Sequence, residues 1–273
     1  MAKLKIGVLV GLTDQPEKDL QKVHDFGLQS CQVSCWKPEL YTPDVGRALK
    51  KASDELDVEI TTLWAGYPGP SVWDFIEGPK TLGLVPPEYR AIRLEALKKG
   101  ADFAAELGLP SITTHCGFIP ETPSDPLWPG LIDAVREIAD HCLKRKLEFW
   151  FETGQETPVT LLRTIETVGT GNLGVNLDPA NLILYGKANP VDALDVFGHY
   201  VRDVHAKDGL YPTDGNNLGQ ETPLGQGKVN FPVFIPKLKS LGYEGALTIE
   251  REISGPQQEA DIRLAIEFLK PLC

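Results

Sequence analysis

Short apolar runs alternate with amphipathic stretches along the whole chain, and this alternation predicts its fold. The apolar runs have the length and composition of buried strands. We expect strands near 4–12, 28–36, 58–65, 111–118, 147–153, 173–179, 201–206 and 245–251. Between them, apolar positions recur every three to four residues and predict helices near 16–26, 43–56, 87–107, 127–146, 158–168, 190–200, 231–241 and 256–270.

The residues at the segment boundaries support this assignment. Thr42, Thr157 and Asn189 each precede a proline that suits the first turn of a helix. Glycines occupy four points where helices should end, at Gly27, Gly108, Gly169 and Gly242. Strand–helix units without a Pro/Gly/Ser-rich linker predict one (β/α)8 TIM barrel, as a single domain over residues 1–273. A doubly wound open sheet is the alternative, but no GxGxxG follows the first strand.

Four of the predicted strands end in a side chain that can bind a metal ion. The runs LEFWFE, LGVNLD, VRDVH and GALTIE end in Glu152, Asp178, His205 and Glu250. Burying a carboxylate is costly unless it is paired or bound to a cation. Strands of a closed barrel converge on its axis, so these four side chains can share one divalent ion; otherwise each is a core residue in an ion pair. The set favours Mn²⁺ or Mg²⁺, while Zn²⁺, Co²⁺ and Fe²⁺ also fit.

Composition and charge narrow the classes of partner. The chain has 27 Lys and Arg against 38 Asp and Glu, and its formal charge of −11 disfavours nucleic acid and anionic membranes. No segment approaches the ~20 apolar residues of a membrane span, and we interpret the opening MAKLKIGVLVGL as a strand rather than a signal sequence. The five cysteines lack paired CxxC spacing, which suits a reducing compartment and predicts a cytoplasmic protein.

Several motifs carry a resemblance to a known group of enzymes. They are FETGQE at 151–156, VNLDPAN at 175–181, DVHAKD at 203–208 and LTIERE at 247–252, with THCGFIP at 114–120 as weaker support. With them the chain resembles the sugar phosphate isomerase/epimerase superfamily, the xylose-isomerase-like TIM barrels that include ketose 3-epimerases and hydroxypyruvate isomerase. The resemblance implies that Glu152, Asp178, His205 and Glu250 bind one divalent cation.

The resemblance also implies a reaction. In the superfamily the residues matching Glu152 and Glu250 face the substrate from opposite sides, so we expect them to be the catalytic pair that removes and returns a proton. The cation would stabilise the enediolate that forms beside a carbonyl. We therefore expect a metal-dependent isomerase or epimerase of a small sugar, keto sugar or polyol derivative. A dehydratase or lyase using the same site and a non-catalytic sugar-binding barrel are the alternatives. Such barrels often pair through their loop faces, which makes a homo-oligomer a further expectation.

Three residues near the predicted strand ends are candidates for substrate binding. His115, at the end of strand four, is either a hydrogen-bond partner for a substrate oxygen or a core histidine. Lys207 and Asp208 follow His205 at the same rim. We expect one of them to contact substrate and the other to orient a metal ligand, since metal-bound imidazoles usually have a second partner.

Four more candidates carry alternatives. Glu156 would bind a substrate hydroxyl or cap the next helix, and capping is slightly favoured. Trp36 and Trp64 would form an apolar wall against a sugar ring or pack in the core. Asn181 stands where many ketose epimerases and endonuclease IV relatives carry a histidine, which disfavours DNA-repair chemistry and changes any substrate contact there. The long loops 66–86 and 207–229 are candidate lids, fixed structural loops or subunit contacts.

Overall fold

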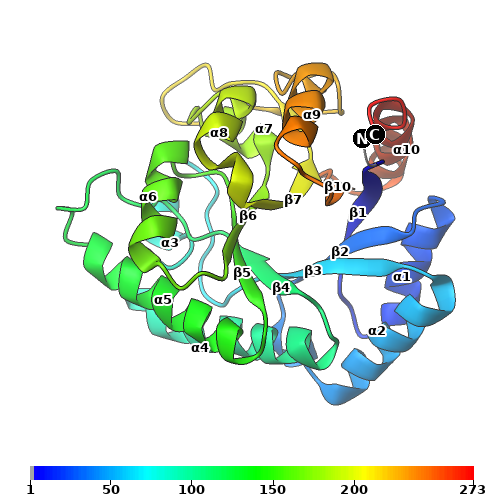
Figure 1. Ribbon diagram of the computed structural model, residues 1–273, viewed down its shortest axis with the longest axis horizontal. Coiled ribbons are helices and arrows are strands. Elements are labelled where there is room, and N and C mark those ends of the chain that lie inside the picture. Colours follow the sequence, from blue (N-terminus) through cyan, green and yellow to red (C-terminus); the bar gives the residue numbers. More distant parts are fainter. Residues whose placement is uncertain (1–2) are drawn as a thin grey trace.

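A closed barrel of parallel strands forms the centre of the computed structural model, which describes residues 3–273 (Figure 1). Its strands are β1 (Lys5–Gly11), β2 (Ser30–Cys35), β3 (Glu59–Ala65), β4 (Ser111–Thr114), β5 (Glu148–Glu152), β6 (Leu173–Leu177), β7 (Val201–Ala206) and β10 (Ala246–Ile249). Each strand pairs with the next in this order, and β10 pairs with β1 to close the ring. The predicted (β/α)8 TIM barrel is thereby confirmed, and the open sheet is excluded.

Helices surround the barrel and join consecutive strands (Figure 1). They are α1 (Pro16–Asp25), α2 (Pro43–Leu56), α4 (Pro87–Glu106), α5 (Trp128–Lys144), α6 (Pro158–Val168), α8 (Pro190–Phe197), α9 (Phe231–Ser240) and α10 (Pro256–Leu269). The predicted caps are confirmed: the side chains of Thr42, Thr157 and Asn189 each accept a backbone N–H of the following helix. Gly169 ends α6 with φ +65°, a conformation that glycine adopts without strain.

The structure adds short elements that the apolar pattern did not predict. Helix α3 (Gly78–Thr81) lies in the loop after β3, and α7 (Pro179–Leu184) follows β6 directly. Two 3₁₀ turns span Pro38–Leu40 and Gly198–Tyr200. Strands β8 (Asp208–Gly209) and β9 (Glu221–Thr222) form an antiparallel ribbon in the loop after β7. Most of these elements lie in loops that follow the carboxyl ends of barrel strands, where they shape the entrance to the barrel.

Alternation along the strands separates an apolar outer layer from a polar interior. Side chains two residues apart share a face, so Phe149 and Phe151 of β5 face the helices while Glu152 faces the axis. The apolar core thus lies between barrel and helices. Inside, the Asp203 carboxylate accepts hydrogen bonds from the Thr61 hydroxyl at 2.6 Å and the Thr248 hydroxyl at 3.3 Å. The interior therefore supports polar side chains at the strand ends by hydrogen bonding.

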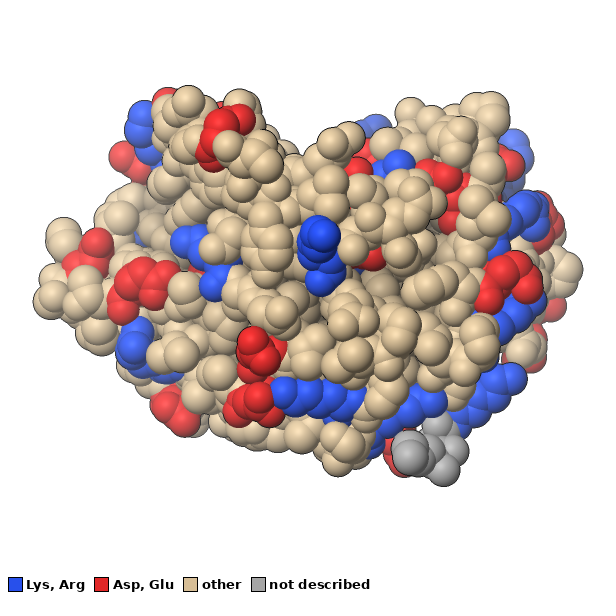
Figure 2. Space-filling view, turned by 90° about the horizontal axis from the view of Figure 1, so that it is seen from above, with Lys and Arg blue, Asp and Glu red and all other residues tan. Residues whose placement is uncertain are grey.

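The exterior carries mixed charge. Figure 2 shows acidic and basic side chains in small groups among uncharged residues on one face of the molecule. The net charge of −11 is therefore not concentrated on this face. Within residues 3–273, no helix combines the length and apolar character that crossing a membrane requires.

Candidate metal centre

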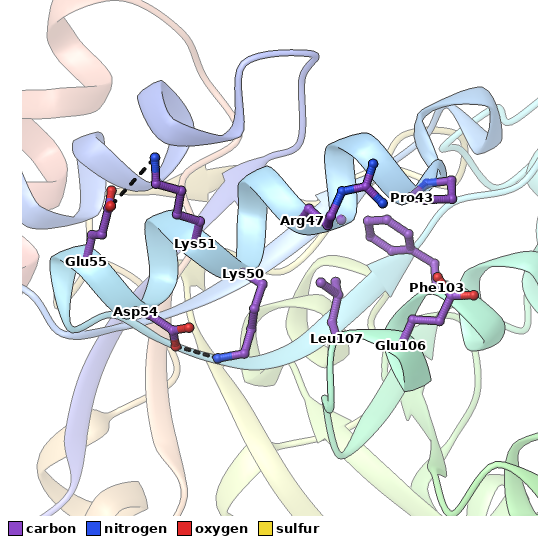
Figure 3. A pocket seen from close by; sticks show the side chains of 10 residues that line it. Pro43, Arg47, Lys50, Lys51, Asp54, Glu55, Phe103, Glu106 and Leu107 are labelled. Carbon is purple, nitrogen blue, oxygen red and sulfur yellow. Dashed lines mark hydrogen bonds and ion pairs between the residues drawn. The ribbon is translucent and has the colours of Figure 1, made fainter.

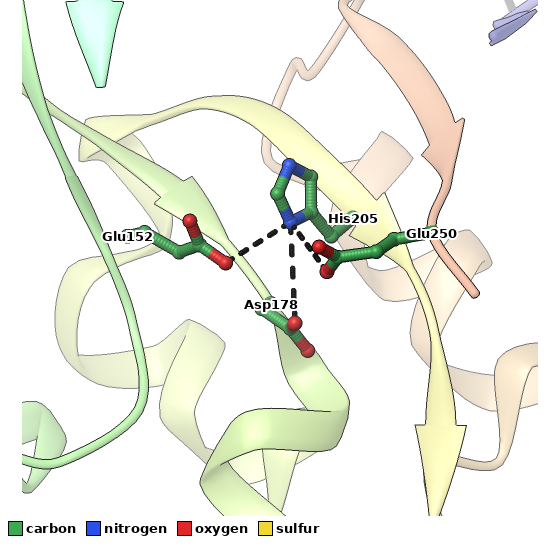
Figure 4. Close-up of side chains that lie close together, drawn as sticks. All are labelled: Glu152, Asp178, His205 and Glu250. Atoms are coloured by element: carbon green, nitrogen blue, oxygen red, sulfur yellow. Dashed lines mark ion pairs between the residues drawn. The ribbon is translucent and has the colours of Figure 1, made fainter. Parts of the chain in front are cut away.

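Three carboxylate side chains and one imidazole meet at the carboxyl end of the barrel (Figure 4). Glu152 ends β5 and His205 lies in β7, while Asp178 and Glu250 follow the last residues of β6 and β10. One ligand atom from each residue lies within 4.8 Å of those of the other three. The predicted convergence of these four side chains is thus seen in the structure, although they come from four different strand ends spread over residues 152–250.

His205 lies between the acids. Its Nδ1 atom is 3.1 Å from a Glu152 oxygen, 3.0 Å from a Glu250 oxygen and 3.9 Å from an Asp178 oxygen (Figure 4). The Lys207 ammonium lies 3.2 Å from both Asp178 and Glu250, and 3.0 Å from Glu252. Lys207 is therefore part of this cluster and balances some of its negative charge.

The other imidazole nitrogen fixes the orientation of His205. Its Nε2–H donates to the Gln32 carbonyl oxygen at 2.8 Å, because an amide oxygen only accepts. Gln32 in turn donates to Asn176 at 3.0 Å, and the Asn176 amide lies 3.0 Å from Nε2. Nδ1 therefore faces the carboxylates, whose charges raise the pKa of His205 well above its usual value and favour a proton on this nitrogen. Binding of a cation would displace that proton and leave the Nδ1 lone pair that metals require. Gln32 and Asn176 were not predicted from the sequence.

The charged side chains of the cluster shift one another's pKa values. Burial would raise the pKa of Glu152, but the nearby imidazoles of His115 and His205 outweigh it and lower the pKa to about 2. Burial likewise opposes ionisation of Glu250, yet Lys207 and His205 hold its pKa well below the usual range. For Asp178, burial dominates and raises the pKa to about 7. The two glutamates are therefore held as carboxylates, the form that a metal ligand or a general base requires.

The donor set fits a divalent cation. Nδ1 of His205 and Oδ2 of Asp178 are buried and lack a hydrogen bond of acceptable geometry, despite their charged neighbours. Buried polar atoms in folded proteins nearly always have a partner, so such atoms mark a place for a ligand or ion. Three carboxylates and one imidazole make an oxygen-rich set of the kind that holds Mn²⁺ or Mg²⁺, and the imidazole also suits Zn²⁺, Co²⁺ or Fe²⁺.

Aromatic side chains enclose Glu152. The indole N–H of Trp64 donates to its carboxylate, and the other carboxylate oxygen lies 3.4 Å from His115 Nε2. The Trp73 ring, from the loop after β3, stands 5.1 Å from the His115 ring. Trp36 packs on Trp64 with ring centres 4.9 Å apart. Both predicted tryptophans therefore lie at the centre, and Trp73 was missed because nothing in its loop sequence indicates its position.

The loop 66–86 is held in place by one buried arginine. Arg93 of α4 is fully buried, and its guanidinium donates to the carbonyl oxygens of Pro68, Pro70 and Gly83 at 2.6 to 3.1 Å. These contacts bind both ends of the loop to one helix. The loop thus covers the Glu152 side of the centre as an anchored segment.

On the Glu250 side the centre is open. A cavity of about 280 Å³ is lined by Glu250 together with Trp36, Glu252, Gln258 and Ser34. Trp36 is 43% exposed, whereas Trp64 is buried. The Trp36 ring is therefore available to an incoming molecule, and Trp64 acts mainly through Glu152.

Two predicted substrate residues lie beside the centre in different roles. Glu156 is buried, with one carboxylate oxygen unpartnered, and burial raises its pKa to about 7. The capping interpretation for Glu156 is wrong, since Thr157 is the residue that caps α6. The Asn181 amide donates to the Thr153 carbonyl at 3.2 Å, and its backbone N–H donates to Asp178 at 2.9 Å. Asn181 therefore contacts a ligand residue through its backbone.

Asp208 hydrogen-bonds to its own loop and not to the four candidate metal ligands. Its carboxylate accepts backbone N–H groups from Gly209, Gly225, Gly227 and Val229 at 2.9 to 3.1 Å. Gly227 is required at this point, because a Cβ there would lie 2.1 Å from an Asp208 oxygen. Asp208 thus closes the loop 207–229, and the structure brings Gln32 rather than Asp208 to His205.

A second surface hollow lies on the outside of the barrel. The groove between α2 and α4 has a volume of about 550 Å³ (Figure 3). Four of its charged side chains pair with each other, as Lys50–Asp54 and Lys51–Glu55. This groove contains none of the four converging ligands.

Comparisons with known proteins agree with this geometry. The model of a family described as xylose isomerase-like TIM barrel matches residues 20–272. The chain belongs to this family. A crystal structure of a xylose isomerase domain protein from Planctomyces limnophilus shares 36% identity and a TM-score of 0.93, covering 98% of this chain and 97% of that one.

More distant relatives share the fold. An uncharacterised protein of Methanocaldococcus jannaschii is 24% identical over 91% of this chain and 84% of its own length. A xylose isomerase-like TIM barrel protein from Mycobacterium smegmatis, crystallised in complex with magnesium, has 16% identity and a TM-score of 0.71 over 99% and 98% of the two chains. Several ketose 3-epimerases superpose with TM-scores of 0.71 to 0.75 at 14 to 18% identity. This family member thus has a barrel in common with metal-containing and sugar-converting proteins.

Proposed function

We propose that the chain is a divalent-metal-dependent isomerase or epimerase that acts on a small sugar, keto sugar or polyol derivative. The observation that carries the proposal is the placement of Glu152 and Glu250 on opposite sides of His205, each about 3 Å from the same nitrogen (Figure 4). Two carboxylates that face one small space from two sides can exchange protons with both faces of a bound carbon. The names of ketose 3-epimerases with the same fold, two of them in structures with D-fructose and D-tagatose, point in the same direction.

The chain's own residues supply the proton chemistry. A divalent cation held by Glu152, Asp178, His205 and Glu250 would add Lewis-acid charge beside a substrate carbonyl. Glu152 would take a proton from the adjacent carbon. Glu250, once protonated by water from the cavity that it borders, would return a proton to the opposite face or to the neighbouring carbon, and the roles would be reversed for a substrate of the other handedness. Trp64 and His115 hold Glu152 in position, while Lys207 holds Glu250 at 3.2 Å. We further propose that Mn²⁺ or Mg²⁺ is the resident ion.

The remaining site residues receive proposed roles. His115, Glu156 and Lys207 would contact substrate oxygens, and Trp36 would lie against the sugar ring. Asn181 and Asp208 would act as positioning residues through Asp178 and the loop 207–229. A single domain over residues 1–273, a cytoplasmic location and a homo-oligomer stay predictions.

Proton exchange tests the proposed function. Purified protein loaded with Mn²⁺ should incorporate deuterium from D₂O beside the carbonyl of at least one ketose in a panel of pentuloses and hexuloses, followed by NMR. Interconversion without loss of water supports isomerisation or epimerisation, whereas loss of water would indicate the elimination reaction. EDTA treatment should abolish exchange. The variant Glu148→Gln is a matched control, because Glu148 begins β5 at the opposite end from Glu152. Metal binding without exchange in any ketose would overturn the proposal.

A further inference from the structure

A group of buried polar atoms without partners lies beside the metal centre. The side-chain nitrogen and oxygen of Gln155, one oxygen of Glu156, the hydroxyl of Tyr185 and Nδ1 of His115 all lack a hydrogen bond. Each of these residues is at most 5% exposed. An unsatisfied buried polar group costs roughly 1–3 kcal/mol, so several of them in one place require a ligand or water to complete them.

These groups share one wall of the site. Gly154 separates the two rings: a Cβ there would lie 3.5 Å from His115 Cε1 and 3.6 Å from Tyr185 Cδ2. The Gln155 carboxamide lies close enough to the Tyr185 phenol to interact with it, but not in the geometry of a well-formed hydrogen bond. Glu156 is close enough to His115 for their charges to interact. Phe75 and Phe118 pack edge-on against Tyr185 at 6.2 and 5.8 Å, which fixes the ring.

His115 connects this wall to the metal centre. Its Nε2 lies 3.4 Å from Glu152, while Nδ1, on the other side of the same ring, has no partner. The wall formed by Gln155 and Tyr185 therefore lies next to the Glu152 carboxylate, on the far side of the His115 ring. The wall offers both donors and acceptors, since a carboxamide, a carboxyl group and a phenol are present. This mixture suits hydroxyl groups, which donate and accept.

We infer that Gln155, Glu156 and Tyr185 form a hydroxyl-binding subsite for the part of the substrate chain beyond the reacting carbons. The inference rests on the proposed function and sharpens it. The preferred substrate is a polyhydroxylated ketose long enough to reach both the four metal ligands and the subsite. A three-carbon ketose reaches only the metal centre and has no hydroxyl groups left to hydrogen-bond with the unpartnered atoms of the subsite.

Binding of ketoses with different numbers of carbon atoms tests the subsite separately from catalysis. Isothermal titration of the Mn²⁺-loaded protein would compare D-fructose and D-psicose with dihydroxyacetone. Tyr185→Phe and Gln155→Leu should each weaken binding of the better hexulose by roughly threefold to tenfold, as expected for one lost hydrogen bond. Both variants should leave binding of dihydroxyacetone within twofold. Tyr211→Phe is the control, since Tyr211 is a 40% exposed tyrosine bonded to the Ala188 carbonyl.

The outcomes separate the two claims. If the variants bind hexuloses and dihydroxyacetone equally weakly, the substituted side chains have a structural role. If hexulose binding is not weakened, or if the unmodified protein does not prefer hexuloses, water alone provides the hydrogen bonds that these atoms lack. Either result overturns the subsite. If deuterium exchange still occurs in that case, the proposed function survives without it. If the protein binds no metal and exchanges no proton, the proposed function itself fails.

Discussion

Glu152 and Glu250, the two glutamates of the centre, differ in their exposure to solvent and in the residues around them. The Glu152 wall, formed with Trp64 and His115, is closed: the Glu152 side chain is 2% exposed, and aromatic rings surround it. The Glu250 wall, formed with Lys207 and Glu252, borders a cavity of about 280 Å³, and the Glu250 side chain is 12% exposed. Water therefore reaches the Glu250 carboxylate more readily than the Glu152 carboxylate.

The walls also hold their carboxylates by different means. Glu152 is held by an indole N–H and two imidazoles, and Glu250 by an ammonium group and one imidazole. Both arrangements keep the carboxylate ionised in spite of burial. The comparison shows that charged neighbours keep both carboxylates ionised: two imidazoles do so for Glu152, and an ammonium group with one imidazole does so for Glu250.

The largest expected effect is on catalysis at the closed wall. Glu152→Gln should lower turnover by about 10²–10⁴-fold, because an amide cannot accept the substrate proton. Turnover would be measured at saturating Mn²⁺, so that a weakened metal affinity is compensated. Circular dichroism should show an unchanged fold. Near-normal turnover in this variant would remove Glu152 from the mechanism, whereas Glu148→Gln should behave as the unmodified protein.

The next effect tests charge balance at the open wall. Lys207→Met should lower the free energy of unfolding of the EDTA-treated protein by about 3–5 kcal/mol, since three carboxylates lose a buried partner. Saturating Mn²⁺ should recover more stability in this variant than in the unmodified protein. Urea unfolding with and without metal measures both. Lys228→Met, at an exposed loop position, is the control; an equal loss there, or no rescue by metal, would contradict the assigned role.

Glu156 extends the closed wall and gives a pH-dependent effect. Burial raises its pKa from 4.5 to about 7, so between these values the folded protein keeps a proton that the unfolded chain releases. This carboxyl therefore reduces stability as pH rises from about 5 to 7. Relative to the unmodified protein, Glu156→Gln should gain up to about 3 kcal/mol between pH 5 and 8.

Urea unfolding of the EDTA-treated proteins at both pH values measures this gain. Glu166→Gln, an exposed position on the following helix α6, should keep the pH dependence of the unmodified protein. A constant stability difference between Glu156→Gln and the unmodified protein would show that Glu156 is ionised in the folded state at pH 5.

The smallest effect concerns the indole that supports Glu152. Trp64→Phe removes one donor and should lower turnover roughly tenfold, the scale of a hydrogen bond to a charged group. Losing this donor raises the lowered pKa of Glu152, so the acid limb of the pH–rate profile should move to higher pH. Trp150→Phe removes a similar indole bond, to Glu148 at 2.7 Å, and should move neither. An unchanged profile in Trp64→Phe would show that this bond does not tune Glu152.

Local signals made the barrel and the convergence of the four candidate ligands predictable. Thr42, Thr157 and Asn189 act within one helical turn, and the ligand positions follow from strand ends that share one edge of a closed ring. Strand boundaries shifted by a few residues: β4 ends at Thr114, so His115 follows the strand instead of ending it.

The supporting contacts depend on distant parts of the chain. Gln32 and His205 are 173 residues apart, and Gln32 lies in an apolar strand with no pattern to mark it. No sequence pattern marks Trp73, Gln155 or Tyr185 either, because their positions depend on how the loops fold over the barrel. For Asp208 the sequence pattern was misleading. Its position three residues after His205 suggested that it orients a candidate metal ligand, but it accepts backbone N–H groups of its own loop instead.

A crystal structure with Mn²⁺, read by anomalous scattering, tests the central claim most directly. The account predicts one strong peak at about 2.0–2.6 Å from an atom of each of Glu152, Asp178, His205 and Glu250, with Lys207 moved away from the ion. A map with no peak among these four side chains, or with Mn²⁺ bound elsewhere while His205 stays in contact with both glutamates, would contradict it.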